Sequence, residues 1–389
     1  MEGLVRILTK RALHAQHGLR STSPIIFPIS RSFSNLAQNK PPSFGIAFDI
    51  DGVILRGESP IGGSPQALRR LYHDHDSGSL KIPYVFLTNG GGFPEGRRAL
   101  ELSGLLGVNI LPSQVLQGHS PFRQLLERFE NEFVVAVGKG DPVAVMVAYG
   151  FKNVLSIDEY ASHFENIDPL AQFKHWTIKK DKQNSSPEQM SPRIDVCSER
   201  VQAAFVVSDP VDWSRDIQVL CDILRTGGLP GRELGHQPSL YFASDDLAYQ
   251  AKFPSERLGM GAFRIALESV YNSIHPNPLE YTSFGKPKPF VFKNAEATLG
   301  QLALSSCGNC RGPGAQNVGG HLLKRLYMIG DNPSVDINGA RQAGHPWFSI
   351  LTRTGVFKGN RNHAEFPADL VVDTVEEAVD YILRKEGSL

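Results

Sequence analysis

The sequence predicts an α/β protein: a Rossmann-like, doubly wound parallel sheet core with an inserted, smaller α/β cap domain. Short apolar segments alternate with amphipathic segments from about residue 44 onward, which is the pattern of parallel strands covered by helices on both faces. The alternation is finer in the middle third of the chain than in the outer thirds. The chain also has 389 residues, more than one ordinary core contains.

The two outer segments are expected to build one core sheet. In the first, 44–120, FGIAFDI and IPYVFLT are expected strands and SPQALRRLYHDH is an expected helix. FPEGRRALELSGLLG is a further helix, with Pro94 near its first turn and Gly107 beyond its end,. The second outer segment, 256–389, contains GMGAFRIALESVYNSI and PFVFKNAEATLGQLAL as helices and RLYMIG as a strand. Both segments therefore follow the βα pattern of a parallel sheet.

The middle segment, 121–255, is the expected cap. It contains two strand–helix–strand sets, which begin at FVVAVG and at AAFVVS. The polar stretch 179–193 between them and the Gly-rich stretch 305–321 are expected loops,. The second loop holds Cys307 and Cys310 with the spacing of a redox or zinc motif, but no second pair accompanies them, which favours an ordinary loop,.

The composition restricts the partners. The 40 Lys and Arg residues balance the 40 Asp and Glu residues, so no overall field favours nucleic acid. No run of 18 apolar residues is present, which predicts no transmembrane segment. Four cysteines are too few to stabilise a chain of this length by disulfides,. We therefore expect no nucleic-acid partner and a reduced compartment.

The first forty residues differ from the rest. They carry six basic residues against one acid, Glu2, and are rich in serine. Leu4, Ile7 and Leu8 share one face of a possible helix, which is typical of an organelle transit peptide,. Segment 1–40 therefore predicts a mitochondrial location, with a plastid transit peptide and a plain disordered tail on a cytosolic protein as alternatives.

Three expected strands end in polar residues. Asp49 and Asp51 follow the first strand, Thr88 and Asn89 follow a second, and Asp331 and Asn332 follow a third. In a doubly wound sheet, ligands bind beyond the carboxyl ends of the strands, where the strand order reverses. We therefore expect these side chains to line one crevice. A fourth stretch, FGKPKP, places Lys286 in a proline-bearing turn.

The four stretches resemble a known family. D-x-D-G-V, T-N, G-K-P and G-D-x-x-x-x-D, in this order, resemble the four motifs of the haloacid dehalogenase-like phosphatase superfamily, over roughly residues 44–389. The inserted unit between the second and third motifs is similar to that of the large-cap subclass. FDIDGV, GKP, GDNPSVD and the terminal RKEG are similar to the mitochondrial hydrolase group that includes the cat eye syndrome critical region protein.

The charges of these motifs call for a metal ion. A phosphate monoester dianion repels a carboxylate, so a carboxylate nucleophile needs a cation beside it. With Asp51 protonated, three carboxylates face the single ammonium of Lys286, which leaves a net charge of −2. Each repulsion at ~4 Å is about 4 kcal/mol near a protein surface. One Mg²⁺ would cancel this charge.

The resemblance implies catalytic roles. Asp49 would attack phosphorus and become an aspartyl phosphate, and Asp51 would act as the general acid and then the general base. Lys286 would neutralise the nucleophile and the transferring group. Mg²⁺ would be held by the side chains of Asp49 and Asp331 and the backbone carbonyl of Asp51.

It also implies supporting contacts. Thr88, Asn89 and Gly90 would bind the phosphate oxygens. Asp336 would orient Lys286 or a metal-bound water, with Asn332 beside it. The substrate would be a small phosphorylated metabolite, and two copies of the chain could associate through the cap.

The chain departs from the family pattern at two places. Gly90-Gly91-Gly92 stands where the subclass usually has another asparagine and a hydroxyl residue, so phosphate contacts would come from backbone N–H groups,. In the cap, ASDD aligns with a loop that usually reads T-N-x-D. Asp245 and Asp246 are therefore candidate substrate contacts, with helix capping as the alternative.

Other functions stay open. A phosphatase of mitochondrial glycerophospholipid metabolism is one version of the reading. A catalytically retired binding module is the main alternative. A dehalogenase is disfavoured because it would use the same nucleophile without needing an acid at Asp51.

Overall fold

The computed structural model describes residues 42–73, 79–174, 195–306 and 323–388. The expected import segment 1–40, the polar loop 179–193 and almost all of the Gly-rich loop with its two cysteines lie outside the described residues.

The core sheet has six strands, and every neighbouring pair in it is parallel. In spatial order they are β15 (Leu370–Val372), β14 (Trp347–Thr352), β13 (Arg325–Gly330), β1 (Phe44–Phe48), β4 (Tyr84–Leu87) and β5 (Val115–Leu116). The chain extends the sheet from β1 to one side through β4 and β5, and later to the other side through β13, β14 and β15. The order therefore reverses between β1 and β13, which is where a doubly wound sheet forms its binding crevice. The predicted fold class is confirmed.

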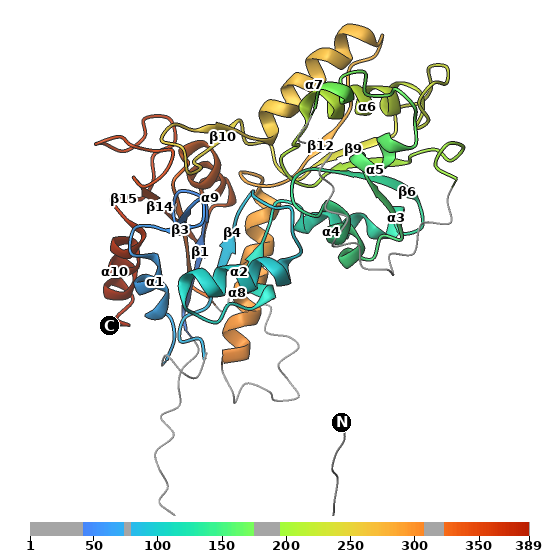
Figure 1. Cartoon of the computed structure of the whole chain (residues 1–389). Coiled ribbons are helices and arrows are strands. Elements are labelled where there is room, and N and C mark those ends of the chain that lie inside the picture. The colour runs from blue at the N-terminus through green and yellow to red at the C-terminus, as the bar shows by residue number, and fades with distance from the viewer. Residues whose placement is uncertain (1–41, 74–78, 175–194, 307–322, 389) are drawn as a thin grey trace, which may run out of the picture. The chain divides into compact units, whose positions relative to one another are not determined.

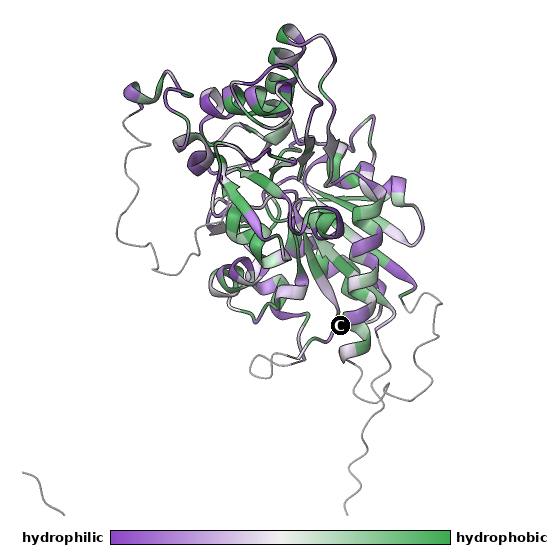
Figure 2. Cartoon of the chain, turned by 90° about the vertical axis from the view of Figure 1, so that its right-hand side faces the viewer, coloured by the Kyte–Doolittle hydropathy of each residue, from purple (hydrophilic) through white to green (hydrophobic). Residues whose placement is uncertain are grey.

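Helices cover both faces of this sheet (Figure 1). Phe44, Ile46 and Phe48 of β1 pack in a cluster with residues of α1 (Ser64–Arg69), α2 (Glu95–Leu106) and α10 (Val375–Lys385). Ala47 lies in a second cluster with residues of α8 (Pro289–Ser306) and α9 (Asn338–Ala343). Apolar residues are concentrated in the strands, whereas the helices carry polar residues as well (Figure 2). Burial on two faces explains why these strands are almost continuously apolar.

The helices of the first core segment test two expectations. Helix α2 begins after Pro94 and ends at Gly107, whose φ of 65° is left-handed, as the sequence predicted,. Helix α1 is shorter than expected, because it ends at Arg69 instead of continuing to residue 75. The Leu71 carbonyl instead accepts hydrogen bonds from the N–H groups of Lys81 and Ile82, so a tertiary contact replaces the helical one.

The cap contains a second parallel sheet. Its strands, in spatial order, are β12 (Thr282–Ser283), β9 (Ser239–Phe242), β8 (Ala203–Val206), β6 (Phe133–Val137) and β7 (Asn153–Ser156). The helices of this part are α3 (Leu126–Phe129), α4 (Pro142–Tyr149), α5 (Ile157–Ser162), α6 (Trp213–Arg225) and α7 (Met260–Ile274). Both faces of the sheet contribute to one apolar cluster.

The cap extends further along the chain than expected. Residues from 256 onward were expected to return to the core, yet α7 and β12 belong to the cap. Phe263 of α7 packs edge-on against Trp213 of α6, with ring centroids 5.4 Å apart, and β12 pairs with β9. The amphipathic pattern of α7 predicts an apolar face but not which sheet that face covers.

Shorter elements complete the described residues. Two antiparallel ribbons pair β2 (Leu55–Arg56) with β3 (Ser59–Pro60) and β10 (Ala248–Tyr249) with β11 (Arg257–Leu258). Single 3₁₀ or π turns occupy Pro112–Gln114, Ser120–Leu125, Ala171–Phe173 and Pro333–Ile337. None of the described helices has the length and apolar character needed to cross a membrane.

Candidate active site

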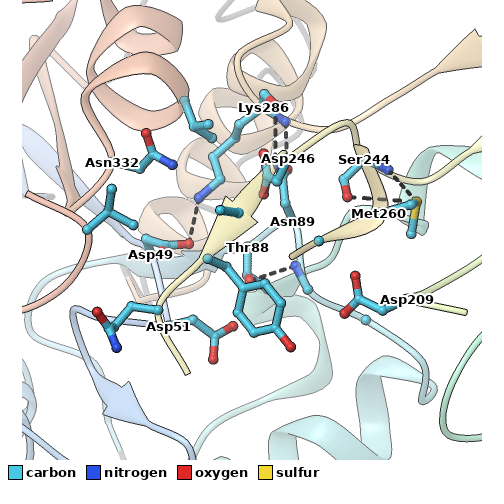
Figure 3. Close-up of a pocket in the computed structure, with 18 of the residues that line it drawn as sticks. Asp49, Asp51, Thr88, Asn89, Asp209, Ser244, Asp246, Met260, Lys286 and Asn332 are labelled. Atoms are coloured by element: carbon cyan, nitrogen blue, oxygen red, sulfur yellow. Dashed lines mark hydrogen bonds and ion pairs between the residues drawn. The ribbon is translucent and has the colours of Figure 1, made fainter. Parts of the chain in front are cut away.

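The polar strand ends line one cavity at the carboxyl edge of the core sheet (Figure 3). Loops of the cap close it from the other side. Of the residues singled out in the sequence, the cavity is lined by Asp49, Asp51, Thr88, Asn89, Gly90, Asp246, Lys286, Asp331, Asn332 and Asp336. The residues that follow β1, β4 and β13 come together because these strands are neighbours in the sheet and end at the same edge.

Lys286 joins two of the acids. Its Nζ lies 2.6 Å from Oδ1 of Asp49 and 2.7 Å from Oδ1 of Asp336. The lysine is only 2% exposed, and a buried lysine is rarely stable unless it is paired. This ammonium therefore compensates part of the negative charge at the end of β1.

Asp336 is fully engaged by the protein. Besides the ion pair with Lys286, its Oδ2 accepts hydrogen bonds from the backbone N–H groups of Asp331 and Asn332, at 3.2 and 3.0 Å. By contrast, Asp331 uses Oδ2 to accept a 2.6 Å hydrogen bond from the N–H of Val356. Among the described residues, one oxygen of Asp331 and one of Asp49 lie outside these hydrogen bonds. Asp336 thus holds the lysine and the turn, while the other two carboxylates keep ligand atoms to offer.

The pKa values of Asp49 and Asp331 are both raised. Burial raises the pKa of Asp49 well above its usual range, although Lys286 opposes the shift. Burial and the Asp336 carboxylate raise the pKa of Asp331 to about 7. Both shifts come first from burial, and neighbouring carboxylates add to them,.

The donor set fits a hard divalent cation. Carboxylate oxygens of Asp49, Asp331 and Asp336 lie within 4.8 Å of one another, and oxygen-only ligands are those that Mg²⁺ prefers. Since Asp336 is already saturated, Asp49 and Asp331 are the side chains suited to hold the ion. The proposed contribution of the Asp51 carbonyl remains a prediction.

Asp51 stands apart from the ion pairs. Its carboxyl lies close to the backbone of Gly90, because a Cβ added at Gly90 would be 3.3 Å from Oδ2 of Asp51. Burial raises the pKa of Asp51, an effect that Arg98 and Lys139 oppose. The next residue, Gly52, has a φ of 93°, and a Cβ there would lie 2.5 Å from Oδ2 of Asp331. A glycine is therefore required where the chain turns away from β1.

Asn89 is a clamp between distant segments. Its Oδ1 accepts a hydrogen bond from the N–H of Lys286 at 2.7 Å, and its Nδ2 donates to the carbonyl of Lys286 at 2.9 Å. The same Nδ2 donates to Oδ1 of Asp246 in the cap at 2.8 Å. The side chain of Asn89 thus places the lysine, and the expected phosphate contact through the Asn89 backbone N–H remains a prediction. Nearby, Thr88 Oγ1 accepts a hydrogen bond from the N–H of Gly90 at 3.0 Å.

The two cap acids behave differently. Asp246 faces the cavity, and burial raises its pKa to about 7. Asp245 does not line this cavity; its Oδ1 instead pairs with Nε of Arg264 at 2.6 Å. Of the two cap acids, only Asp246 lines the cavity that holds Asp49 and Asp331.

Sequence reasoning missed several residues that line the cavity. Lys139 follows β6, its Nζ forms a 2.8 Å ion pair with Oδ2 of Asp209, and it lies 5.4 Å from the ring centroid of Tyr249. Lys139 and Asp209 both follow strands of the cap sheet, so the strand-end rule that found the core residues could have found them. The Val356 N–H that binds Asp331 left no signal in the sequence.

Family models match both core segments. Residues 46–152 match the model described as haloacid dehalogenase-like hydrolase, and residues 283–378 match the model described as HAD-hydrolase-like. The matched ranges carry every core residue of the cavity named above.

Individual proteins give the same result. A mitochondrial hydrolase of Saccharomyces cerevisiae is 31% identical over 90% of this chain and 97% of its own length. A cardiolipin synthase (CMP-forming) / mitochondrial hydrolase fusion protein of Schizosaccharomyces pombe is 31% identical over 91% of this chain, which spans 56% of that protein. A glycerol phosphate phosphatase of Mycobacterium tuberculosis, solved in complex with magnesium, has the same fold with a TM-score of 0.52 at 16% identity, over 88% of this chain and 77% of that one.

The 31% identity to the Saccharomyces cerevisiae hydrolase extends over 97% of that protein, well beyond the four motifs. It agrees with the parallel core sheet, the inserted cap and the acids at the strand ends. The chain therefore belongs to the haloacid dehalogenase-like hydrolase family and is an enzyme of the hydrolase class.

Proposed function

We propose that this protein is a Mg²⁺-dependent phosphatase that hydrolyses a small phosphate monoester through an aspartyl phosphate on Asp49. The observation that carries the proposal is the grouping at the end of β1. Asp49 lies 2.6 Å from the buried ammonium of Lys286 and shares the cavity with Asp331 and Asp51. A carboxylate nucleophile, a cation, a metal-ligand set and a separate acid are the groups that the reaction needs.

The first half-reaction uses Asp49 and Asp51. A carboxylate oxygen of Asp49 attacks phosphorus, the bond from phosphorus to the leaving oxygen breaks, and Asp51 donates its proton to that oxygen. The raised pKa of Asp51 favours the protonated form that this step requires. Lys286 balances the charge on the nucleophile and on the transferring phosphoryl group,.

The second half-reaction uses the same two residues. Asp51, now ionised, accepts a proton from a water molecule that attacks the phosphorus of the aspartyl phosphate. The bond between phosphorus and Asp49 then breaks and releases inorganic phosphate. A bound Mg²⁺, held by Asp49 and Asp331, would supply the positive charge that brings the dianion and the nucleophile together.

The names of two relatives support one class of substrate. One is named as a glycerol phosphate phosphatase, and another joins a hydrolase to a cardiolipin synthase. We therefore propose a phosphate monoester of glycerophospholipid metabolism as the first substrate class to test. Because the two sequence relatives are both named as mitochondrial hydrolases, we also propose a mitochondrial location. The dimer through the cap remains a prediction.

Activity is the direct test. The purified protein should hydrolyse members of a phosphomonoester panel that includes p-nitrophenyl phosphate, glycerol phosphate and a glycerophospholipid with a terminal phosphate. EDTA should abolish turnover and Mg²⁺ should restore it. Asp49→Asn should remove turnover, because the amide is a far weaker nucleophile, whereas Asp245→Asn, outside the cavity, should retain it. Activity in Asp49→Asn equal to that of the wild type would refute the covalent route.

Metal binding can be tested without a substrate. Mg²⁺ at 100 times its dissociation constant should stabilise the fold by about 2.7 kcal/mol, measured as a rise in the thermal unfolding midpoint. Asp331→Asn should lose this response, and Asp245→Asn should keep it. Stabilisation by Mg²⁺ without turnover of any phosphate ester would favour a retired binding module over the phosphatase.

A further inference from the structure

A buried chain of hydrogen bonds lies outside the cavity described above. Tyr149 donates its hydroxyl hydrogen to Oε1 of Glu95 at 2.6 Å, and the hydroxyl oxygen lies 2.7 Å from Nδ1 of His119. Ser120 also donates to Oε1 of Glu95 at 2.9 Å, and Arg123 donates to its Oε2 at 2.9 Å. Both oxygens of the Glu95 carboxylate are thus engaged.

Glu95, His119 and Tyr149, which form the central part of this hydrogen-bond network, come from three parts of the fold. Glu95 begins α2 of the core, and Tyr149 ends α4 of the cap. His119 lies in the segment that leads from β5 into the cap. This chain of hydrogen bonds therefore joins core and cap at the first of the two connections between them.

The direction of the hydrogen bonds can be assigned. The Tyr149 hydroxyl has one hydrogen, and Glu95 accepts it, so the Nδ1–H of His119 must donate to the hydroxyl oxygen,. Burial lowers the pKa of His119 to about 4, although Glu95 opposes the shift. The imidazole is therefore neutral near pH 7 and points its other nitrogen away from Tyr149.

The imidazole supports the glycine loop Gly90–Gly92. A Cβ added at Gly91 would lie 2.5 Å from Cδ2 of His119 and 3.0 Å from its Nε2, so the ring packs directly against the backbone of this loop. Nε2 of Gln117 donates to the carbonyl of Phe93 at 3.0 Å. From the cap, the N–H of Asp141 donates to the carbonyl of Gly92 at 2.7 Å. The loop is thus held by the connection on one side and by the cap on the other.

These contacts account for the departure from the family pattern. Any side chain at position 91 would collide with His119. One at position 92 would lie 2.5 Å from the carbonyl oxygen of Lys139 in the cap. Gly92 also has a φ of 113°, which L side chains rarely adopt,. Two of the three glycines are required by the packing of the connection and the cap on this loop.

We propose that Tyr149 and His119 are positioning residues: the hydrogen-bonded chain from Glu95 holds the cap connection so that the imidazole fixes the glycine loop beside the phosphate position. Neither residue lines the cavity, so they act through Gly91. That the loop binds phosphate rests on the proposed function. That Tyr149 and His119 fix the position of the loop does not depend on it.

The test uses Tyr149→Phe in the full chain, with Tyr160→Phe as matched control. Tyr160 is also fully buried in the cap, and within the described residues its hydroxyl has no hydrogen-bond partner. With p-nitrophenyl phosphate and Mg²⁺, Tyr149→Phe should raise KM and the inhibition constant of inorganic phosphate about fivefold, as expected for one lost hydrogen bond. Tyr160→Phe should leave both constants unchanged.

The KM readout separates positioning from folding. A purely structural role would reduce the amount of folded enzyme, which lowers the apparent kcat and leaves KM unchanged. An unchanged KM in Tyr149→Phe, or an equal rise in Tyr160→Phe, would overturn the proposal.

Hydrogen exchange of the peptide that contains residues 88–93 provides the second measurement. Its amides should exchange about fivefold faster in Tyr149→Phe, from the same lost hydrogen bond, and at the wild-type rate in Tyr160→Phe. If the wild type cleaves no phosphate ester, the proposed function fails while exchange still tests the loop. Equal exchange rates in the two variants would refute the positioning role.

Discussion

Lys286 shows how acids that follow two neighbouring strands, β1 and β13, can be buried together. It compensates Asp49 and Asp336 directly, and both its backbone N–H and its carbonyl are held by Asn89. Removing the lysine would leave two buried carboxylates unpaired, a change that typically costs about 3–5 kcal/mol. Three carboxylates, those of Asp49, Asp331 and Asp336, still face one ammonium within 4.8 Å of one another, which is the physical reason to expect a divalent cation.

The burial of His119 leads to a prediction of how the free energy of unfolding depends on pH. It faces Glu95, Arg123 and Tyr149, and its folded-state pKa of about 4 is below the ordinary value of 6.5. Between these values the unfolded chain binds more protons, so stability should fall as pH decreases, by about 2 kcal/mol from pH 7.5 to pH 5. Urea unfolding of the wild type and of His119→Gln at both pH values isolates this contribution, because the other groups cancel. A stability difference that does not change with pH would contradict it.

The ends of three core strands determine where the site lies. β1, β4 and β13 are neighbours, and each is followed at once by a turn that carries polar side chains. Glycines permit these turns where other segments approach closely, as at Gly92 beside the cap. Inside a helix, alanine is favoured over glycine, because glycine there only adds conformational freedom to the unfolded chain.

One substitution type should therefore have opposite effects in two elements. Gly92→Ala should lower the free energy of unfolding by about 1–3 kcal/mol, through its positive φ and the contact with the carbonyl of Lys139,. Gly104→Ala in α2, where no atom lies within 4 Å of the added Cβ, should raise it by roughly 0.5–1 kcal/mol. Urea titrations measure both values. Equal signs for the two variants would show that the loop tolerates a side chain.

At the scale of the molecule, the described residues hold both sheets and the candidate active site. Both sheets and all the helices named above belong to the described residues, which begin at residue 42. The candidate active site and the elements that support it therefore lie after residue 41, and an import role for segment 1–40 remains a prediction,.

Removing residues 1–40 should separate these two roles. The shortened protein should keep the thermal unfolding midpoint and the Mg²⁺-dependent kcat/KM of the full chain. In cells, a fluorescent fusion of the full chain should accumulate in mitochondria and the shortened fusion should not. Plastid accumulation would support the alternative transit peptide, and an unchanged distribution would refute the import role.

The sequence by itself determined the fold class and the edge at which the polar residues meet. Short, almost continuously apolar runs between amphipathic segments identify strands that are buried on both faces, and parallel strands end at one edge, so both features follow from local pattern. The ends of α2 were readable for the same reason, since Pro94 and Gly107 act within one turn. Only the tertiary structure decided that Asn89 clamps Lys286, that Lys139 enters from the cap, and that α7 covers the cap sheet. Those contacts join segments far apart in the chain, and an apolar or polar face does not encode its partner.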